Sequence, residues 1–150
     1  MHKILFVCHG NICRSTMAEF VMKDLVEKAG RASEFVIDSA ATSREEIGND
    51  VHPGTRRKLE REGVPCGHHH SRQIMREDLD AWDYIVAMDQ ENLAGLRRIL
   101  GAEAVASPKV SLLLSWANRS GDIADPWYTG NFDETYRDVL EGCAALIAAL

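Results

Sequence analysis

An apolar run that ends in a tight polar loop is the feature of this sequence that most constrains its fold. Residues 4–7, ILFV, are followed directly by residues 8–15, CHGNICRS, and apolar residues then recur every three or four positions up to Gly30. This order predicts a buried strand, a loop and an amphipathic helix. A loop in that place turns its backbone N–H groups toward the start of the helix, where a phosphate-sized dianion can bind.

The remaining periodic segments continue the alternation of strands and helices. Short apolar runs predict buried strands at residues 35–37, 84–88 and 110–114. Helical spacing of apolar residues predicts helices at residues 55–62, 91–100 and 133–150. Such an alternation builds a parallel sheet that binds ligands beyond the carboxyl ends of its strands, where the strand order reverses. We therefore expect the α/β class: a single-domain open parallel four-stranded sheet with helices on both faces and a phosphate-binding loop after strand 1.

The side chains of the loop are suited to phosphoryl transfer. Cys8 can be a nucleophile, because backbone N–H groups, a guanidinium and a helix N-terminus all favour the thiolate. Arg14 offers a planar fork of donors for two phosphoryl oxygens, and Ser15 can donate its hydroxyl to the sulfur. Gly10 permits close approach of the backbone, and Asn11 tolerates a left-handed conformation. A structural cysteine beside a surface arginine is the alternative, which the position between a strand and a helix disfavours.

The segment Asp125-Pro126-Trp127-Tyr128 can supply the proton that such a reaction needs. Phosphoryl transfer to sulfur leaves an alkoxide or phenoxide to be protonated, and cleavage of the thiophosphate later requires a base. Asp125 can serve both steps, since Pro126 restricts it to an extended backbone. Trp127 and Tyr128 can form apolar walls for an aromatic leaving group. Taken alone, the segment favours an ordinary Asp-Pro turn that carries two surface aromatics, because Asp-Pro commonly starts a turn.

Length, charge and cysteine content narrow the class of protein. The chain has 150 residues, 45% of them hydrophobic, so residues 1–150 can bury the core of one domain, and no apolar run is long enough to span a membrane. The formal net charge of −6 argues against a nucleic-acid partner. The sequence enters its first strand without a signal-like segment, so we expect free thiols and a cytoplasmic location.

The loop resembles the Cys-x5-Arg-Ser signature of the low-molecular-weight protein tyrosine phosphatases. Further segments are similar to that family in the same order along the chain, namely Asp38-Ser39-Ala40, His69-His70-Ser71-Arg72-Gln73, Tyr84-Ile85-Val86-Ala87-Met88-Asp89 and Asp125-Pro126-Trp127-Tyr128. The resemblance implies hydrolysis of protein phosphotyrosine and aryl phosphates through a phosphocysteine intermediate, without a metal or organic cofactor. It also implies inhibition by the oxyanions phosphate and vanadate, and we expect a monomer without nucleic-acid or membrane partners.

The same resemblance implies a role for each matching residue. Cys8 is the nucleophile, Arg14 the phosphate clamp and Asp125 the general acid and then the base. The implied phosphate-binding residues are His9, Gly10, Asn11, Ile12, Cys13, Arg14 and Ser15. The implied network that holds the loop in shape consists of Asn11, Ser15, Ser39 and His69.

Two positions carry further expectations. Glu45 stands at about the place where many members of the family carry an aromatic wall, so it joins Trp127 and Tyr128 in the expected substrate pocket. Cys13 either fills apolar space or captures an oxidised Cys8 as a disulfide, and the family implies the second role.

Other functions remain as alternatives. A zinc site at the run 68–70 with Cys66 is disfavoured, because successive side chains diverge and no second pair completes a tetrahedron. Thiol-dependent arsenate reductases share the fold but need two cysteines near the middle of the chain, where only Cys66 lies. Protein-arginine phosphatases carry threonine at the position of Ile12. A cysteine phosphocarrier, the alternative outside enzymes, lacks counterparts of Arg14 and Asp125.

Overall fold

Four parallel strands form the central sheet of the computed structural model, which describes residues 1–150. The strands are β1 (His2–Cys8), β2 (Phe35–Ala41), β3 (Tyr84–Ala87) and β4 (Val110–Leu112). Their order is β2-β1-β3-β4, so β1 pairs with β2 on one side and with β3 on the other. The direction of the connections therefore reverses at β1, which places a ligand site at the end of that strand.

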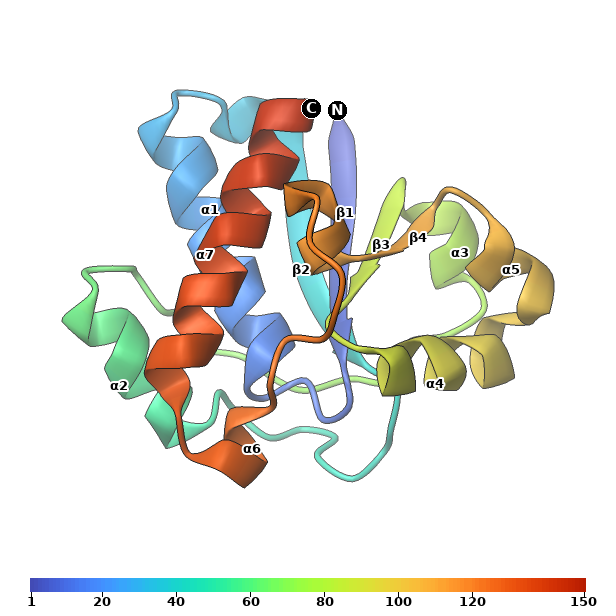
Figure 1. Cartoon of the computed structure of the whole chain (residues 1–150), viewed down its shortest axis with the longest axis horizontal. Helices are drawn as coiled ribbons and strands as arrows, with labels where there is room; N and C mark the ends of the chain where they lie inside the picture. Colours follow the sequence, from blue (N-terminus) through green and yellow to red (C-terminus); the bar gives the residue numbers. More distant parts are fainter.

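Helices cover both faces of the sheet, as Figure 1 shows with the sheet seen nearly edge-on. One face carries α1 (Arg14–Lys28), α2 (Pro53–Arg61), α7 (Phe132–Ala149) and a 3-10 turn, η2 (Leu113–Ala117). The other face carries α3 (Asp78–Ala81), α4 (Gln90–Leu100) and α5 (Ala102–Ala106). A further 3-10 turn, η1 (Ala32–Glu34), precedes β2, and the short α6 (Pro126–Thr129) lies beyond the carboxyl ends of the strands. The predicted fold class is confirmed.

The residues of β1 alternate between two hydrophobic cores. Ile4 and Phe6 pack with α1, α2 and α7, while Leu5 and Val7 pack with α4 and α5. All four side chains are fully buried, which explains why the strand reads as an unbroken apolar run rather than an alternating one. Cys8 continues the first series and so begins the loop on the α1 side of the sheet.

Two predicted boundaries were wrong. The strand expected at 110–114 ends at Leu112, and η2 follows. Leu113 and Leu114 are both buried, which a tight helical turn permits, and a short apolar run cannot by itself distinguish a strand from such a turn. The second strand continues past its apolar run to Ala41, where it still pairs with Cys8 of β1. Its later residues are small or polar, so the apolar run alone did not show this extension. The short helices α3, α5 and α6 were not predicted.

Gly142 lets α7 approach η2 closely. A Cβ atom built at this position would lie 2.5 Å from Cγ of Leu113, whose side chain is fully buried. A larger residue therefore has to displace a packed core.

We expect Gly142→Val to lower the free energy of unfolding by about 1–3 kcal/mol, since overpacking forces neighbouring side chains out of their rotamers. Ala144→Ser, on the exposed side of the same helix, is the matched control and is expected to change it by no more than about 0.5 kcal/mol. Urea unfolding measures both, and equal stability of the two variants would contradict this account of the packing.

Candidate active site

The loop after β1 leaves a series of backbone donors unused. Cys8 is the last residue of β1 and Arg14 the first of α1. None of the backbone N–H groups of residues 9–14 donates to an acceptor in the protein. Asn11 has a φ of 59°, the left-handed conformation that asparagine tolerates better than most residues. Consecutive free N–H groups at the start of a 15-residue helix form an anion-binding concavity.

Cys8 is buried at the floor of this loop, with an exposed fraction of 3%. Its Sγ lies 3.1 Å from Oγ of Ser15, and the backbone N–H of Ser15 points at the sulfur at 3.4 Å. The hydrogen of the Ser15 hydroxyl can rotate, so at this distance the hydroxyl can donate to the sulfur when Cys8 is a thiolate, which can only accept.

The four predicted supporting residues meet around Asn11. The side-chain amide of Asn11 donates to Oγ of Ser15 at 2.8 Å and to Oγ of Ser39 at 2.9 Å. Nε2–H of His69 donates to the carbonyl oxygen of Asn11 at 2.8 Å. Ser71, which was not predicted, donates to the carbonyl of Gly10 at 2.8 Å. The bonds from His69 and Ser71 hold the carbonyl groups of Asn11 and Gly10 outward. The N–H groups of the loop are therefore left directed inward.

Sequence reasoning also missed Glu19 behind this network. Its carboxylate accepts a hydrogen bond from Oγ of Ser39 at 2.5 Å and pairs with Lys23 at 2.6 Å. The side chain of Glu19 is buried, and an acidic residue one turn into an otherwise apolar helix face was the available signal. A buried carboxylate needs such partners to offset its lost hydration.

Arg14 is buried to 2% exposure beside the sulfur. One terminal nitrogen, Nη1, donates to Asp89 at 2.6 Å and to the carbonyl of Ile123 at 2.9 Å, and Nη2 approaches Asp125 at 3.4 Å. Its Nε has no partner. Burial opposes the charge, but the neighbouring Cys8 and Asp89 outweigh burial and raise the pKa of Arg14. A buried, charged donor without an acceptor favours an anion at this point.

Asp89 was missed as a partner of Arg14. It follows β3, caps α4 by accepting from the N–H of Asn92 at 2.7 Å, and holds the guanidinium with its other oxygen. The spacing Asp89-x-x-Asn92 was visible as a capping signal. The contact with Arg14 was not, because it joins the ends of two neighbouring strands.

Asp125 lies at the rim, where it caps α6. Its Oδ1 accepts the backbone N–H of Trp127 at 3.0 Å, and its backbone is extended, as expected before Pro126. The remaining oxygen faces Arg14. The carboxyl therefore lies over the loop with one oxygen tied to its own short helix.

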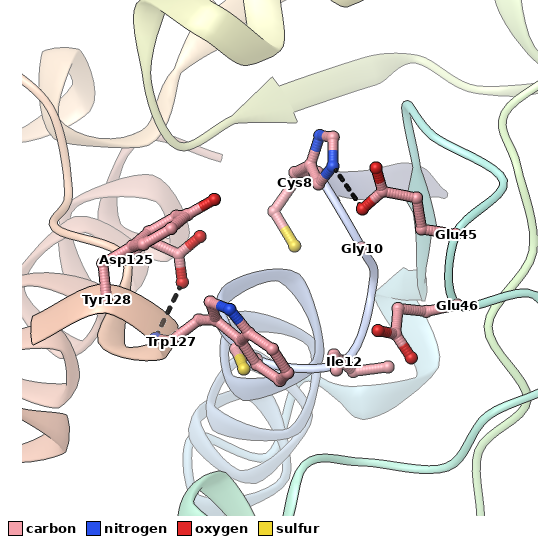
Figure 2. A pocket seen from close by; sticks show the side chains of 10 residues that line it. Cys8, Gly10, Ile12, Glu45, Glu46, Asp125, Trp127 and Tyr128 are labelled. Atoms are coloured by element: carbon pink, nitrogen blue, oxygen red, sulfur yellow. Dashed lines mark hydrogen bonds and ion pairs between the residues drawn. The ribbon is translucent and has the colours of Figure 1, made fainter. Parts of the chain in front are cut away.

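The expected pocket residues surround one cavity. It is lined by Cys8, His9, Gly10, Ile12, Cys13, Glu45, Glu46, Asp125, Trp127 and Tyr128. Figure 2 shows Trp127 and Tyr128 on one side of Cys8 and Glu45 and Glu46 on the other. The wall opposite the aromatic residues is polar, since Nε2 of His9 lies 3.0 Å from Oε2 of Glu45.

The second loop cysteine has a thiol that holds its proton. Burial and the adjacent Cys8 raise the pKa of Cys13 to about 12. His68 and His70, by contrast, are exposed outside the cavity. No group of three or more His, Cys, Asp or Glu side chains in residues 1–150 is placed to hold a metal ion, and no helix is long and apolar enough to cross a membrane.

The family model described as low molecular weight phosphotyrosine protein phosphatase matches residues 3–150. The chain belongs to this family. The predicted resemblance and the prediction of a cysteine-dependent phosphatase are therefore confirmed at the level of the family, whose members act on phosphoproteins. Among its curated relatives, the protein-tyrosine-phosphatase YfkJ of Bacillus subtilis is 41% identical, and the match covers 100% of this chain and 96% of the relative.

Solved structures of family members agree with the fold. The crystal structure of YfkJ from Bacillus subtilis has a TM-score of 0.93 and 42% identity, over 99% of this chain and 94% of that one. The crystal structure of DARP, a Drosophila arginine phosphatase, has a TM-score of 0.85 and 32% identity, over 98% of this chain and 96% of that one. Relatives that share this fold are therefore named after two different phosphorylated residues, tyrosine and arginine.

The Asp89–Arg14 pair gives a testable expectation for this phosphatase. Asp89→Asn keeps an oxygen to cap α4 but removes the charge that holds the guanidinium. Since a hydrogen bond to a charged group contributes about 1.5–3 kcal/mol, we expect kcat/KM for p-nitrophenyl phosphate to fall roughly 10- to 100-fold. The melting temperature should fall as well, because the buried guanidinium loses a carboxylate that balances its charge. Activity is therefore compared well below the melting temperature of the variant.

Asp122→Asn is the matched control, because the exposed Asp122 bonds the backbone N–H of Gln90 at the same helix start without touching Arg14. Its activity should equal that of the wild type. Full activity of Asp89→Asn would show that Arg14 is positioned without this contact.

Proposed function

We propose that this family member hydrolyses phosphotyrosine in proteins, and aryl phosphates, through a phosphocysteine intermediate. Three observations together carry the proposal. Cys8 lines the cavity with loop residues 9, 10, 12 and 13, and the N–H groups of residues 9–14 are free. The buried Arg14, whose charge interacts with Cys8, has an Nε without a partner. These groups match a phosphoryl dianion in charge and in number of donors. In this proposal residues 9–14 bind phosphate, whereas Ser15, whose N–H points at the sulfur, supports the nucleophile. No metal or organic cofactor takes part.

The first chemical step transfers the phosphoryl group from the tyrosine oxygen to Cys8 Sγ. Backbone N–H groups and the Arg14 guanidinium bind the non-bridging oxygens and stay with them as the phosphorus becomes trigonal bipyramidal. Asp125, protonated on the oxygen that is not held by the Trp127 N–H, donates its proton to the departing phenoxide. The Ser15 hydroxyl stabilises the attacking thiolate.

The second step returns the enzyme to its starting state. Asp125, now a carboxylate, removes a proton from water as the water attacks phosphorus, and the P–S bond breaks to release inorganic phosphate and the Cys8 thiolate. Phosphate is thus a product that occupies the donor set, and vanadate matches the trigonal bipyramidal geometry. Both oxyanions are therefore proposed inhibitors.

Tyrosine fits the cavity better than the alternatives. Ile12 presents an apolar side chain where threonine is found in arginine phosphatases, and Trp127 and Tyr128 flank the entrance with aromatic surface. The likeness to the Drosophila arginine phosphatase keeps protein phosphoarginine as the second candidate substrate. We further propose that the protein is a monomer, since every group that the reaction needs comes from one chain. A cytoplasmic location is proposed as well.

The decisive measurement compares turnover of phosphotyrosine, phosphoserine and phosphoarginine peptides of one sequence. Phosphotyrosine should turn over with the highest kcat/KM. Cys8→Ser should abolish turnover of every substrate and still bind phosphate, because the loop donors and Arg14 remain. Multiple turnover by Cys8→Ser would refute the covalent mechanism, and preferred turnover of phosphoarginine would replace the proposed substrate.

A redox role for Cys13 is also proposed. Hydrogen peroxide oxidises Cys8 to the sulfenic acid, and attack by Cys13 then forms a disulfide with loss of water. Because the pKa of Cys13 is about 12, the thiolate fraction rises with pH across the neutral range, and capture should be faster at pH 8.5 than at pH 7. The wild type should regain activity in dithiothreitol, whereas Cys13→Ser should lose it irreversibly. Equal recovery would leave Cys13 with a packing role only.

A further inference from the structure

His52 lies at the meeting point of four parts of the structure. It precedes α2, where its Nδ1 accepts the backbone N–H of Gly54 at 3.0 Å and so caps the helix. The backbone N–H of His52 donates to the carbonyl of Ile12 at 2.9 Å, which attaches His52 to the phosphate-binding loop. Thr55, one turn further, donates to the carbonyl of Cys13 at 3.3 Å. The start of α2 and the loop therefore form one hydrogen-bonded unit.

The imidazole ring of His52 contacts the segment that carries the proposed acid. It stacks on Phe132, the first residue of α7, with ring centroids 5.5 Å apart and planes at 24°. It meets Trp127 edge-on, with centroids 5.7 Å apart and planes at 79°. Contacts of this geometry contribute beyond the area they bury. Gly54 makes room for Phe132 against this turn, since a Cβ at Gly54 would lie 2.3 Å from the Phe132 ring.

The segment around α6 has few other anchors on the substrate side. Trp127 is 58% exposed and Tyr128 is 83% exposed, and α6 is a four-residue helix that ends at Gly130 in a left-handed conformation. The backbone N–H of Trp127 is also the group that holds Oδ1 of Asp125 at 3.0 Å. A displacement of Trp127 that shifts its backbone therefore also moves the carboxyl of Asp125 relative to the sulfur. Figure 2 shows these two residues on the same side of the cavity.

We propose that His52 is a positioning residue for the acid step: its ring fixes Trp127, and Trp127 fixes the carboxyl of Asp125 over the phosphate-binding loop. The proposal rests on the proposed function, because it takes Asp125 as the proton donor. His52 touches neither the sulfur nor the phosphate-binding donors. Its loss should therefore slow proton donation to the leaving group and spare the attack by Cys8.

Two substitutions separate the ring of His52 from its capping nitrogen. His52→Asn keeps an acceptor for the Gly54 N–H and loses the ring. His52→Phe keeps a ring for Trp127 and Phe132 and loses the cap. If His52 acts on catalysis by stabilising α2, His52→Phe, which lacks the cap, should show the slower proton donation. If His52 acts by positioning the acid, His52→Asn, which lacks the ring, should show it.

The experiment measures kcat/KM for aryl phosphates whose leaving phenols span a range of pKa, together with the melting temperature of each variant. Misplacement of a reacting group by about 1 Å can cost 100-fold, and general acid catalysis contributes roughly 10²–10⁴-fold. His52→Asn should therefore lose about tenfold or more with phenyl phosphate and retain its rate within about threefold with a dinitrophenyl phosphate. It should also melt a few degrees lower, because it loses the ring contacts with Phe132 and Trp127. His52→Phe should keep the wild-type dependence on the leaving group and melt about 2–4 °C lower.

Asp125→Ala and His68→Asn complete the set. Asp125→Ala should show the steepest dependence on the leaving group, and His68→Asn, at an exposed histidine away from the cavity, should behave as the wild type. Trp127→Ala should steepen the dependence, and adding His52→Asn to it should produce no further change, because both act through one contact.

The outcomes separate the proposed role of His52 from the proposed role of Asp125 as the acid. If Asp125→Ala steepens the dependence and His52→Asn does not, or if His52→Phe steepens it as much as His52→Asn, the role of His52 is overturned while the acid stands. If Asp125→Ala slows all substrates equally, Asp125 is not the acid, and the roles proposed for Asp125 and His52 are both wrong.

Discussion

A guanidinium that is almost entirely removed from water has to be neutralised where it lies, and the arrangement of this site follows from that requirement. Arg14 receives a carboxylate from the end of β3, a backbone carbonyl from the segment that leads to α6, and a second carboxylate at the rim. Its Nε is still without an acceptor. The charge therefore holds three chain segments together and keeps an anion site at their junction.

The sheet supplies the rigidity that this arrangement needs. β1 is central, parallel to both neighbours and buried on both faces, so its carboxyl end is fixed by two ladders and two cores. Cys8 is at that end, and the network around Asn11 then fixes the conformation of the loop. The site is thus preorganised for an anion before a substrate arrives, which is the condition for electrostatic stabilisation of a transition state.

The short α6 segment has less support from the core than the loop has. Asp125, the proposed proton donor at its start, must face the loop, although most side chains of α6 are exposed. His52 links this segment to the loop through a ring contact on one side and a backbone bond on the other. The polar pair His9 and Glu45 at the opposite wall gives this protein a cavity with one aromatic and one charged side.

The sequence by itself determined the local structure and the chemical groups of this protein. Periodicity predicted the strands and long helices, because burial on a sheet or along a helix face leaves a regular pattern, and the loop carried Cys8 and Arg14 within one short motif. Only the tertiary structure decided that Asp89 holds Arg14, that Glu19 supports Ser39, and that His52 meets Trp127. These contacts join residues far apart in the chain, and each depends on which strand ends and loops the parallel topology brings to one edge of the sheet.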